Sequence, residues 1–219
     1  LHRSYSVISP AESRELEFLV KNLRGGQASR FFHTEAKAGM TLEVVNLGNH
    51  LWQPEWNTLP QDFIAFSGGI GISPVFSCMQ QAMTSELSHR FTLYHSSPSE
   101  RRRLLKNDLL PFQAHDRMAT YFLSTDSNNN DSLGANRIKR DQVARWLRNK
   151  PGIQDATYLI SGPHGMMEEV HRGLDALGIP MSQRHTEYFT DRQLSHETEA
   201  PLLNQLGTLR PHCDVEIEQ

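Results

Sequence analysis

Residues 62–76 read DFIAFSGGIGISPVF: a short apolar run leads directly into three closely spaced glycines and a proline. The apolar run over 62–66 predicts a buried strand, and the residues after the turn predict a helix over 73–85. Glycines at such a turn let the backbone approach a ligand closely, and the free N–H groups at a helix start favour a phosphate. The segment therefore predicts a phosphate-binding turn, with a merely tight strand-to-helix connection as the alternative.

The alternation of strand and helix continues toward the carboxyl terminus. Strands are expected over 90–94, 118–123, 157–160 and 185–189, helices over 99–110, 140–148 and 163–177, and a polar loop over 124–136. Strands that alternate with helices form a parallel sheet with helices on both faces. The sequence therefore predicts an α/β domain over residues 57–190.

The residues on either side of this domain have different patterns. Within residues 1–56, strands are expected over 3–10, 16–23 and 41–45, with one short helix over 27–35 and an aperiodic connector over 51–59. Residues 191–219 are polar and broken by proline, which favours a linker. Because the chain opens without a methionine, and both ends alternate like the interior of a strand, we interpret it as an excerpt of a longer protein.

Composition excludes several classes of protein. The chain has 219 residues, of which 37% are hydrophobic and 21% charged, and its formal net charge is −3. No apolar run approaches the roughly 20 residues that span a bilayer, and the charge provides no field to attract nucleic acid or anionic lipid. Cys78 and Cys213 form no disulfide framework, and the histidines are scattered, so no metal site is predicted. We expect a cytoplasmic protein whose partners include neither nucleic acid nor membrane.

A second glycine turn, SGPHG at residues 161–165, follows a later strand. The carboxyl ends of parallel strands lie at one edge of a sheet, where open α/β sheets bind their ligands. The two glycine turns are therefore expected to flank one cleft, into which Ser161 would offer a hydroxyl. An ordinary loop with a proline in the first helical turn is the alternative.

A third signal lies near the amino terminus, where Arg3 and Tyr5 share one face of the expected strand and Ser6 points to the other. A cation beside an aromatic ring suits a flavin nucleotide. Both residue types are also common on exposed strand faces, so this signal is weak alone.

Five motifs in order resemble the ferredoxin–NADP reductase superfamily: RxYS at 3–6, GGxxSxxF at 25–32, GxGIxP at 69–74, xGPxxMM at 161–167 and ExF at 187–189. The chain is most similar to oxygenase reductase components of the phenylacetyl-CoA epoxidase type, and hybrid-cluster-protein reductases are close relatives. The resemblance implies that residues 1–56 are the second part of an antiparallel β-barrel that binds FAD. It further implies a parallel-sheet NAD(P)-binding domain over 57–190, and a linker over 191–219 with a possible first strand of a [2Fe–2S] ferredoxin domain.

The resemblance also implies roles for the residues expected to bind flavin. Arg3 would bind the flavin pyrophosphate, Tyr5 would pack on the isoalloxazine and Ser6 would hydrogen-bond near the flavin N5. A second pyrophosphate contact would come from Gly25, Gly26 and Ser29. Glu187 and Phe189 would lie near the reactive edge of the flavin.

Other motif residues would contact the nicotinamide nucleotide. It would be cradled by Gly69, Gly71, Ser73 and Pro74, and bordered at its nicotinamide by Ser161, Gly162 and Pro163. By the same resemblance, the groups beside the reacting atoms are Ser6, Ser161 and Glu187.

The implied activity is electron transfer with FAD and NAD(P)H as cofactors. Hydride from NAD(P)H would reduce FAD, and single electrons would pass to a [2Fe–2S] cluster of a longer parent protein and then to a partner oxygenase or another acceptor. The alternative is a regulatory or docking subunit without turnover. A hydrolase or nucleotide transferase is not supported, because the chain has no G-x-S-x-G elbow and no P-loop lysine after its glycine turns.

Three departures from the family pattern bear on this interpretation. Ser161 stands where the family usually has Cys, and Ser73 replaces a usual Thr. Ser96 and Ser97 occupy the place of an Asn-Arg pair, which leaves the choice between NADH and NADPH open. The run over 101–103, three arginines, would either contact a ribose 2′-phosphate or lie on a solvated helix face.

Overall fold

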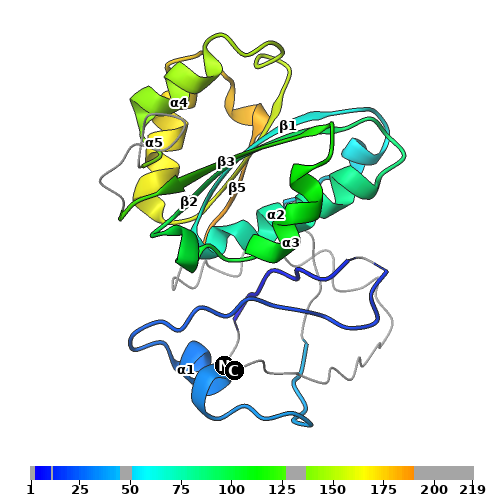
Figure 1. Ribbon diagram of the computed structural model, residues 1–219, viewed down its shortest axis with the longest axis vertical. Coiled ribbons are helices and arrows are strands. Elements are labelled where there is room, and N and C mark those ends of the chain that lie inside the picture. Colours follow the sequence, from blue (N-terminus) through cyan, green and yellow to red (C-terminus); the bar gives the residue numbers. More distant parts are fainter. Residues whose placement is uncertain (1–2, 11, 45–50, 127–136, 190–219) are drawn as a thin grey trace, which may run out of the picture.

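A computed structural model describes residues 3–10, 12–44, 51–126 and 137–189 (Figure 1). A five-stranded sheet has the order β3-β2-β1-β4-β5, and all neighbouring strands are parallel. The strands are β1 (Asp62–Gly68), β2 (Arg90–Ser97), β3 (Met118–Ser124), β4 (Thr157–Ser161) and β5 (Arg184–Glu187). The predicted parallel sheet is confirmed.

Helices cover both faces of the sheet (Figure 1). On one face lie α2 (Ile72–Thr84) and α3 (Lys106–Gln113), and on the other lie α4 (Arg140–Leu147) and α5 (His164–Asp175). Short 3₁₀ turns complete the connections: η1 (Pro54–Asn57), η2 (Gly69–Gly71), η3 (Glu100–Arg102) and η4 (Met181–Gln183). The described part of the chain contains no helix that is both long and apolar enough to cross a bilayer.

Alternation along the strands divides the core into two clusters. Phe63 and Ala65 of β1 pack toward α2, whereas Ile64 and Phe66 pack toward α4 and α5. Burying one such large apolar side chain stabilises the fold by about 1.5–3 kcal/mol. Each central strand is therefore apolar on both faces, as expected for a parallel sheet covered on both sides.

The segment over 51–59, expected to be an aperiodic connector, contributes to the core. Trp52 and Trp56 are buried and pack edge-to-face against each other, with ring centroids 5.4 Å apart. Both rings also contact Phe63 of β1. Periodicity gave no sign of this burial, because two large aromatic side chains in an irregular segment follow no repeat.

The amino-terminal segment is less regular than predicted. Its helix, α1 (Gln27–Thr34), is confirmed. None of the strands expected over 3–10, 16–23 and 41–45 is regular. An isolated antiparallel bridge joins Val7 to Phe18, and residues 41–44 are irregular. Within the described residues the segments around Val7 and Phe18 pair only with each other, and such a pair is marginal because a stable ladder needs further strands or a helix to cover one face.

Smaller differences concern the ends of elements. The helix expected over 99–110 is split, because Leu105 has a left-handed backbone with φ of 53° between η3 and α3. Strand β5 begins and ends earlier than the expected 185–189. Residues 127–136 of the expected loop and the linker over 191–219, with Cys213, lie outside the described residues.

Helices α4 and α5 pack closely at Gly173. A Cβ placed on Gly173 would lie 2.6 Å from the Cβ of Val143 and 3.0 Å from the carbonyl oxygen of Arg140. We predict that Gly173→Ala destabilises the chain by about 1–3 kcal/mol, the usual cost of overpacking. Gly165→Ala, on the same helix where a Cβ meets nothing within 4 Å, is the matched control and should be neutral or slightly stabilising. Equal midpoints for the two variants in chemical denaturation would contradict the prediction.

Candidate functional site

The structure brings the two glycine turns into contact at the carboxyl edge of the sheet. A Cβ on Gly71 would lie only 2.3 Å from the carbonyl oxygen of Ser161, and a Cβ on Gly162 would lie 2.9 Å from the amide nitrogen of Gly68. Gly69 has a φ of 54° and Gly162 a φ of 154°, values that L side chains rarely adopt. The sequence at these turns is therefore dictated by backbone packing as well as by any ligand.

Ser73 and Pro74 shape the first turn of α2. The Ser73 hydroxyl donates to the carbonyl oxygen of Ile70 at 3.0 Å, and both side chains are buried. Proline is tolerated in a first helical turn because the N–H it lacks there has no partner within the helix. Their contact with a nucleotide stays a prediction.

A row of polar side chains crosses the sheet beside these turns. Strand register sets Glu187 opposite Ser161, Ser161 opposite Ser67, and Ser67 opposite His95. Ser161, Ser67 and His95 have no exposed surface. The Ser161 hydroxyl donates to the Glu187 carbonyl oxygen at 3.2 Å, and Ser67 Oγ shares a hydrogen bond with His95 Nδ1 at 2.8 Å.

Two predicted residues from opposite ends of the chain meet at the end of this row. The Ser6 hydroxyl donates to Glu187 Oε1 at 2.8 Å, across 181 positions of sequence. The amino-terminal segment is also held to α2, because the Ser77 hydroxyl donates to the carbonyl oxygen of Val7. Ser6, Ser161 and Glu187 thus form one connected group.

Tyr5 lies among aromatic side chains next to Ser6. Its ring packs edge-to-face against Phe18 and Phe32, with centroids 6.4 Å and 5.5 Å away. Partial burial raises the pKa of the Tyr5 hydroxyl, against the lowering effect of Arg3. Tyr5 is half-buried and Arg3 is exposed, so part of each remains accessible for a ligand.

The predicted phosphate turn of the amino-terminal segment borders a hollow of about 290 Å³. Residues 22–27 and Arg30 line it. Gly25 has a φ of 81°, and Gly26 precedes the first turn of α1. Ser29 lies behind the turn: its hydroxyl accepts a hydrogen bond from the Leu23 amide at 3.1 Å and donates to the Gly26 carbonyl at 3.3 Å.

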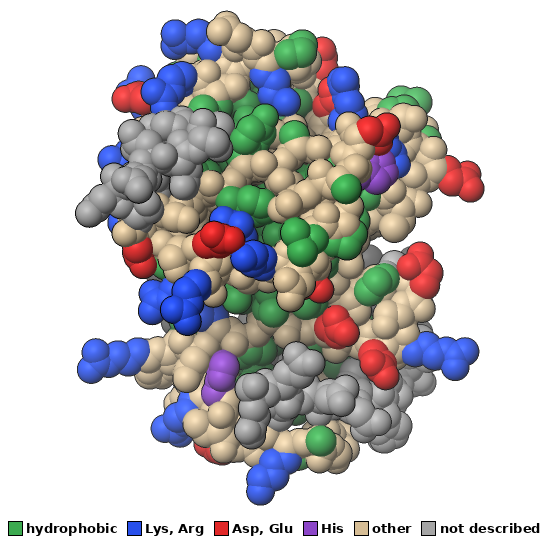
Figure 2. Space-filling view, viewed as in Figure 1, with side chains coloured by type: hydrophobic (Ala, Val, Ile, Leu, Met, Phe, Trp, Pro, Cys, Tyr) green, Lys and Arg blue, Asp and Glu red, His purple; other side chains and the backbone are tan. Residues whose placement is uncertain are grey.

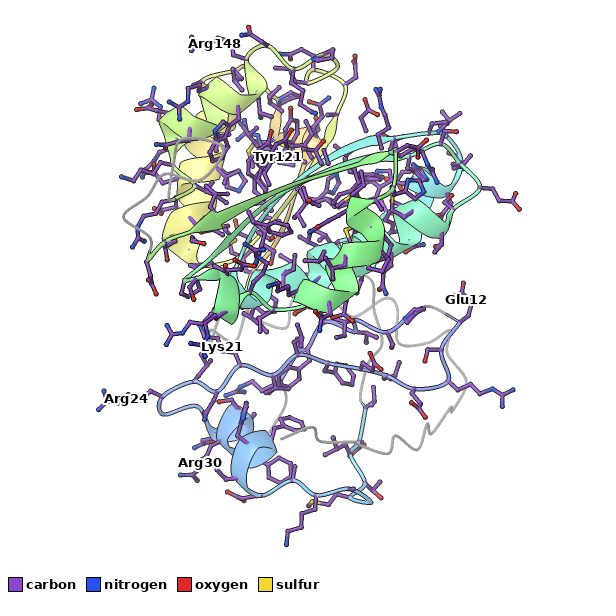
Figure 3. All side chains as sticks on the ribbon, in the orientation of Figure 1. Glu12, Lys21, Arg24, Arg30, Tyr121 and Arg148 are labelled. Carbon is purple, nitrogen blue, oxygen red and sulfur yellow. The ribbon has the colours of Figure 1, made fainter. Side chains whose placement is uncertain are left out.

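The charged residues that line this hollow, Arg24 and Arg30, are both cations, and Arg30 Nε lies 4.0 Å from Oε1 of Glu35. Lys21, Arg24 and Arg30 lie on the same side of the amino-terminal segment (Figure 3). Lys and Arg side chains are frequent over this part of the surface (Figure 2). Cations and free N–H groups at a helix start together suit an anionic group such as a pyrophosphate.

The arginine run over 101–103 is divided by the structure. Arg101 and Arg102 are exposed, whereas the Arg103 guanidinium lies 3.9 Å from the centre of the Phe122 ring. Such cation–π contacts stabilise by about 0.5–2 kcal/mol. Arg101 and Arg102 thus lie on a solvated face, and the contact of this run with a ribose 2′-phosphate stays a prediction.

The remaining sequence predictions concern Phe189, Cys78 and a metal site. Phe189 is 40% exposed beyond the end of β5, while Cys78 is buried in the core, and burial raises the pKa of its thiol. Among the described residues, no three His, Cys, Asp or Glu side chains are grouped so as to hold a metal ion.

Ser67 and His95 are site residues that the sequence patterns did not reveal. Each is a polar residue near the end of an otherwise apolar strand, and that is the signal that could have found them. Burial, followed by the charge of Arg103, lowers the pKa of His95 to about 3. The imidazole is therefore neutral, and within the described part of the chain its Nε2 has no hydrogen-bond partner.

Comparison with known proteins finds a family match within the α/β part of the chain. Residues 65–172 match the family described as an oxidoreductase NAD-binding domain. The matched segment begins in β1 and ends in α5, and it includes both glycine turns. The glycine turns and the row of polar side chains lie at the carboxyl edge of the reductase-type sheet, where such sheets bind ligands.

The reductase-type fold extends over most of the chain. The structure of a ferredoxin–NADP reductase from Neisseria gonorrhoeae with bound FAD and NADP superimposes with a TM-score of 0.68 at 23% identity. The match covers 84% of this chain and 78% of that one. Similarity at this level of identity shows the fold.

Relatives with assigned functions are similar over the same extent. The flavohemoprotein of Xylella fastidiosa is 25% identical over 192 residues, which is 86% of this chain and 46% of the relative. A 1,2-phenylacetyl-CoA epoxidase subunit from Escherichia coli is 27% identical over 195 residues, which is 86% of this chain and 54% of the relative. The chain thus spans about half the length of these relatives.

The buried His95 predicts a dependence of stability on pH. Unfolding restores the pKa of His95 to its ordinary value near 6.5. Between pH 6.5 and 3 the imidazole is therefore protonated in the unfolded state and neutral in the folded state. Stability is therefore retained above pH 6.5 and lost as the pH falls, by up to about 1.4 kcal/mol per pH unit. In chemical denaturation at several pH values, the free energy of unfolding of His95→Asn should depend less steeply on pH, by the amount that corresponds to nearly one proton. An unaltered slope in His95→Asn would refute the assignment.

Proposed function

We propose that the chain is part of a flavin-dependent reductase that takes reducing equivalents from NAD(P)H through FAD. The observation that carries the proposal is the junction of Ser6, Glu187 and Ser161 beside the two glycine turns. It joins the matched NAD-binding domain to an amino-terminal segment that can hold an anion. Relatives that are flavohemoproteins and an epoxidase component support the same interpretation.

The residues present fit FAD. The hollow at Gly25 and Gly26 suits a pyrophosphate, because it combines a helix start, a glycine with positive φ and the cation of Arg30. Tyr5 offers a half-buried aromatic ring one residue before Ser6, which contacts Glu187. We assign the flavin to this side of the junction, with Arg3 as a further phosphate ligand and Phe189 near the reactive edge.

The matched domain is assigned the nicotinamide nucleotide. Gly69 and Gly71 bring backbone N–H groups to the start of α2, where a phosphate is favoured. Gly162 and Pro163 form the adjoining wall, and the Ser161 hydroxyl lies beneath it. Residues 1–56 and 57–190 are accordingly proposed as the flavin part and the nucleotide part.

The chain's own side chains position groups and hold a proton. FAD, when bound, supplies the conversion of a two-electron donor into one-electron transfers. Ser161 fixes the backbone of Glu187, and the Glu187 carboxylate accepts the proton of the Ser6 hydroxyl in a hydrogen bond. These contacts place the Ser6 oxygen and the Glu187 carboxylate side by side at the junction. The proposed reaction requires no nucleophile from the protein.

The electron acceptor is proposed from resemblance. Among the described residues, Cys78 is the free cysteine and it is buried, so this part of the chain does not fit a [2Fe–2S] cluster. We place any such cluster in a longer parent protein, together with a partner oxygenase or another acceptor. A cytoplasmic location is proposed on the same basis.

Substitution of Gly71 tests the nucleotide site. In Gly71→Ala the new methyl group meets the Ser161 carbonyl, so the two turns must separate. We expect the dissociation constant for NAD(P)⁺, measured by calorimetry, to rise at least tenfold, or about 1.4 kcal/mol. FAD binding should be unchanged, and Gly173→Ala, which overpacks α5 against Val143 outside the two turns, is the control and should bind nucleotide normally. Equal loss of flavin and nucleotide binding would indicate a folding defect and count against the site.

Substitution of Ser161 tests the reaction. Ser161→Cys restores the residue usual in the family but replaces a firm hydrogen bond to the Glu187 carbonyl with a weak S–H donor. With FAD supplied, flavin bleaching by NADH or NADPH in a stopped-flow instrument should change in rate by about tenfold, or 1–2 kcal/mol of barrier. An unchanged rate would remove Ser161 from the nicotinamide site. Nucleotide binding without any bleaching in the unsubstituted chain would favour a docking subunit.

A further inference from the structure

Strand β5 carries Glu187 and is weakly secured by the sheet itself. It has four residues and lies at an edge of the sheet, where β4 is its one partner among the strands that the structure describes. Its side chains alternate: His185 contacts Trp56 on the α2 side at 4.7 Å between ring centroids, and Glu187 follows on that side. Arg184 and Thr186 point to the other side, toward α5.

Arg184 fastens the beginning of β5 to α5. Its side chain is 2% exposed, and its Nη2 lies 2.7 Å from Asp175 Oδ1. Nη2 also donates to the carbonyl oxygen of Ile179, and Nη1 donates to the carbonyl oxygen of His171 at 3.3 Å. A charge this deeply buried is held by an ion pair and by carbonyl groups, as its desolvation requires.

His171 of α5 contacts Thr186, the next residue of β5 whose side chain points toward α5. Its Nε2 lies 3.2 Å from Thr186 Oγ1, and its Nδ1 lies 3.5 Å from Nη1 of Arg184. A guanidinium can only donate, so Nδ1 must accept and the ring proton must be on Nε2. Nε2–H then donates to the Thr186 hydroxyl, and the neutral ring satisfies both neighbours at once.

We propose that neutral His171 is a positioning residue, which holds β5 against α5 and thereby keeps the Glu187 carboxylate on the Ser6 hydroxyl. The functional part of this inference rests on the proposed reductase activity. Thr186 is held on one face, and the adjacent Glu187 is presented on the other. Movement of β5 would therefore act on the 2.8 Å contact between Glu187 and Ser6.

Protonation of His171 opposes this arrangement. An imidazolium would set an Nδ1–H against the N–H groups of Arg184, two cations in contact. Burial and then Arg184 lower the pKa of His171, while Asp175 raises it. Tyr158 of β4, the other titratable group beside Arg184, stays neutral because burial raises its pKa to about 12. His185 faces the opposite side of β5. The interaction is thus present at neutral pH and is lost as the pH falls through the lowered pKa.

Hydrogen–deuterium exchange of the peptide that covers β5 tests the proposal without flavin. Corrected for the intrinsic rate, its protection in the unsubstituted chain should fall about tenfold between pH 7.5 and 5. His171→Ala should lower protection at both values. His171→Gln, which keeps an uncharged donor, should retain protection at pH 7.5 and lose less of it at pH 5 than the unsubstituted chain does. Arg172→Gln, at the next and exposed position, is the matched control and should behave like the unsubstituted chain.

Two further measurements separate positioning from a merely structural role. Nitrogen NMR of the histidine ring should find the proton on Nε2 at pH 7.5. In the chain supplied with FAD, His171→Ala should lower kcat for flavin reduction by about tenfold with KM for NAD(P)H unchanged, and His171→Gln should restore it. A proton on Nδ1, or full β5 protection in His171→Ala, would overturn the proposal. Absence of flavin reduction in the unsubstituted chain would instead overturn the proposed function, because the exchange and NMR results do not depend on it.

Discussion

The contact between two backbone turns at the carboxyl edge of the sheet is the constraint on which the site depends. Gly71 has no room for a Cβ because the Ser161 carbonyl lies 2.3 Å from that position, and Gly162 is similarly close to the backbone of Gly68. This approach makes β1 and β4 end side by side. The surface that a nucleotide would meet is therefore built mainly of backbone, with N–H groups whose positions are set by packing.

The site also depends on hydrogen bonds that satisfy buried polar groups. A buried hydroxyl left without a partner, such as that of Ser161 or Ser67, would cost about 1–3 kcal/mol. Ser161 donates to the backbone of Glu187, Ser6 to its carboxylate, and Ser67 pairs with His95. The amino-terminal segment completes this network, so that its docking on α2 and β5 is part of the chemistry of the site as well as of its stability.

Local sequence signals predicted two kinds of element: strands that are fully buried and helices that are stabilised by contacts within a few residues. The apolar run before Gly68 forms β1. The helix expected over 27–35 is α1, and it starts directly after the turn at Gly25 and Gly26. The strands over 16–23 and 41–45 could not be predicted reliably, because a strand exists only where a partner strand provides its ladder. Trp52 and Trp56 were missed since their burial follows from the shape of the neighbouring sheet.

Sequence patterns alone predicted the parallel α/β sheet, the helices that cover it and the two glycine turns. These follow from patterns that lie within a few residues of one another along the chain. The contacts of Ser6 with Glu187, of Ser67 with a neutral His95, and of His171 with Thr186 of β5 became visible in the folded chain alone. The physical reason is that strand register and alternation decide which distant side chains share a face, and neither is written in any single motif.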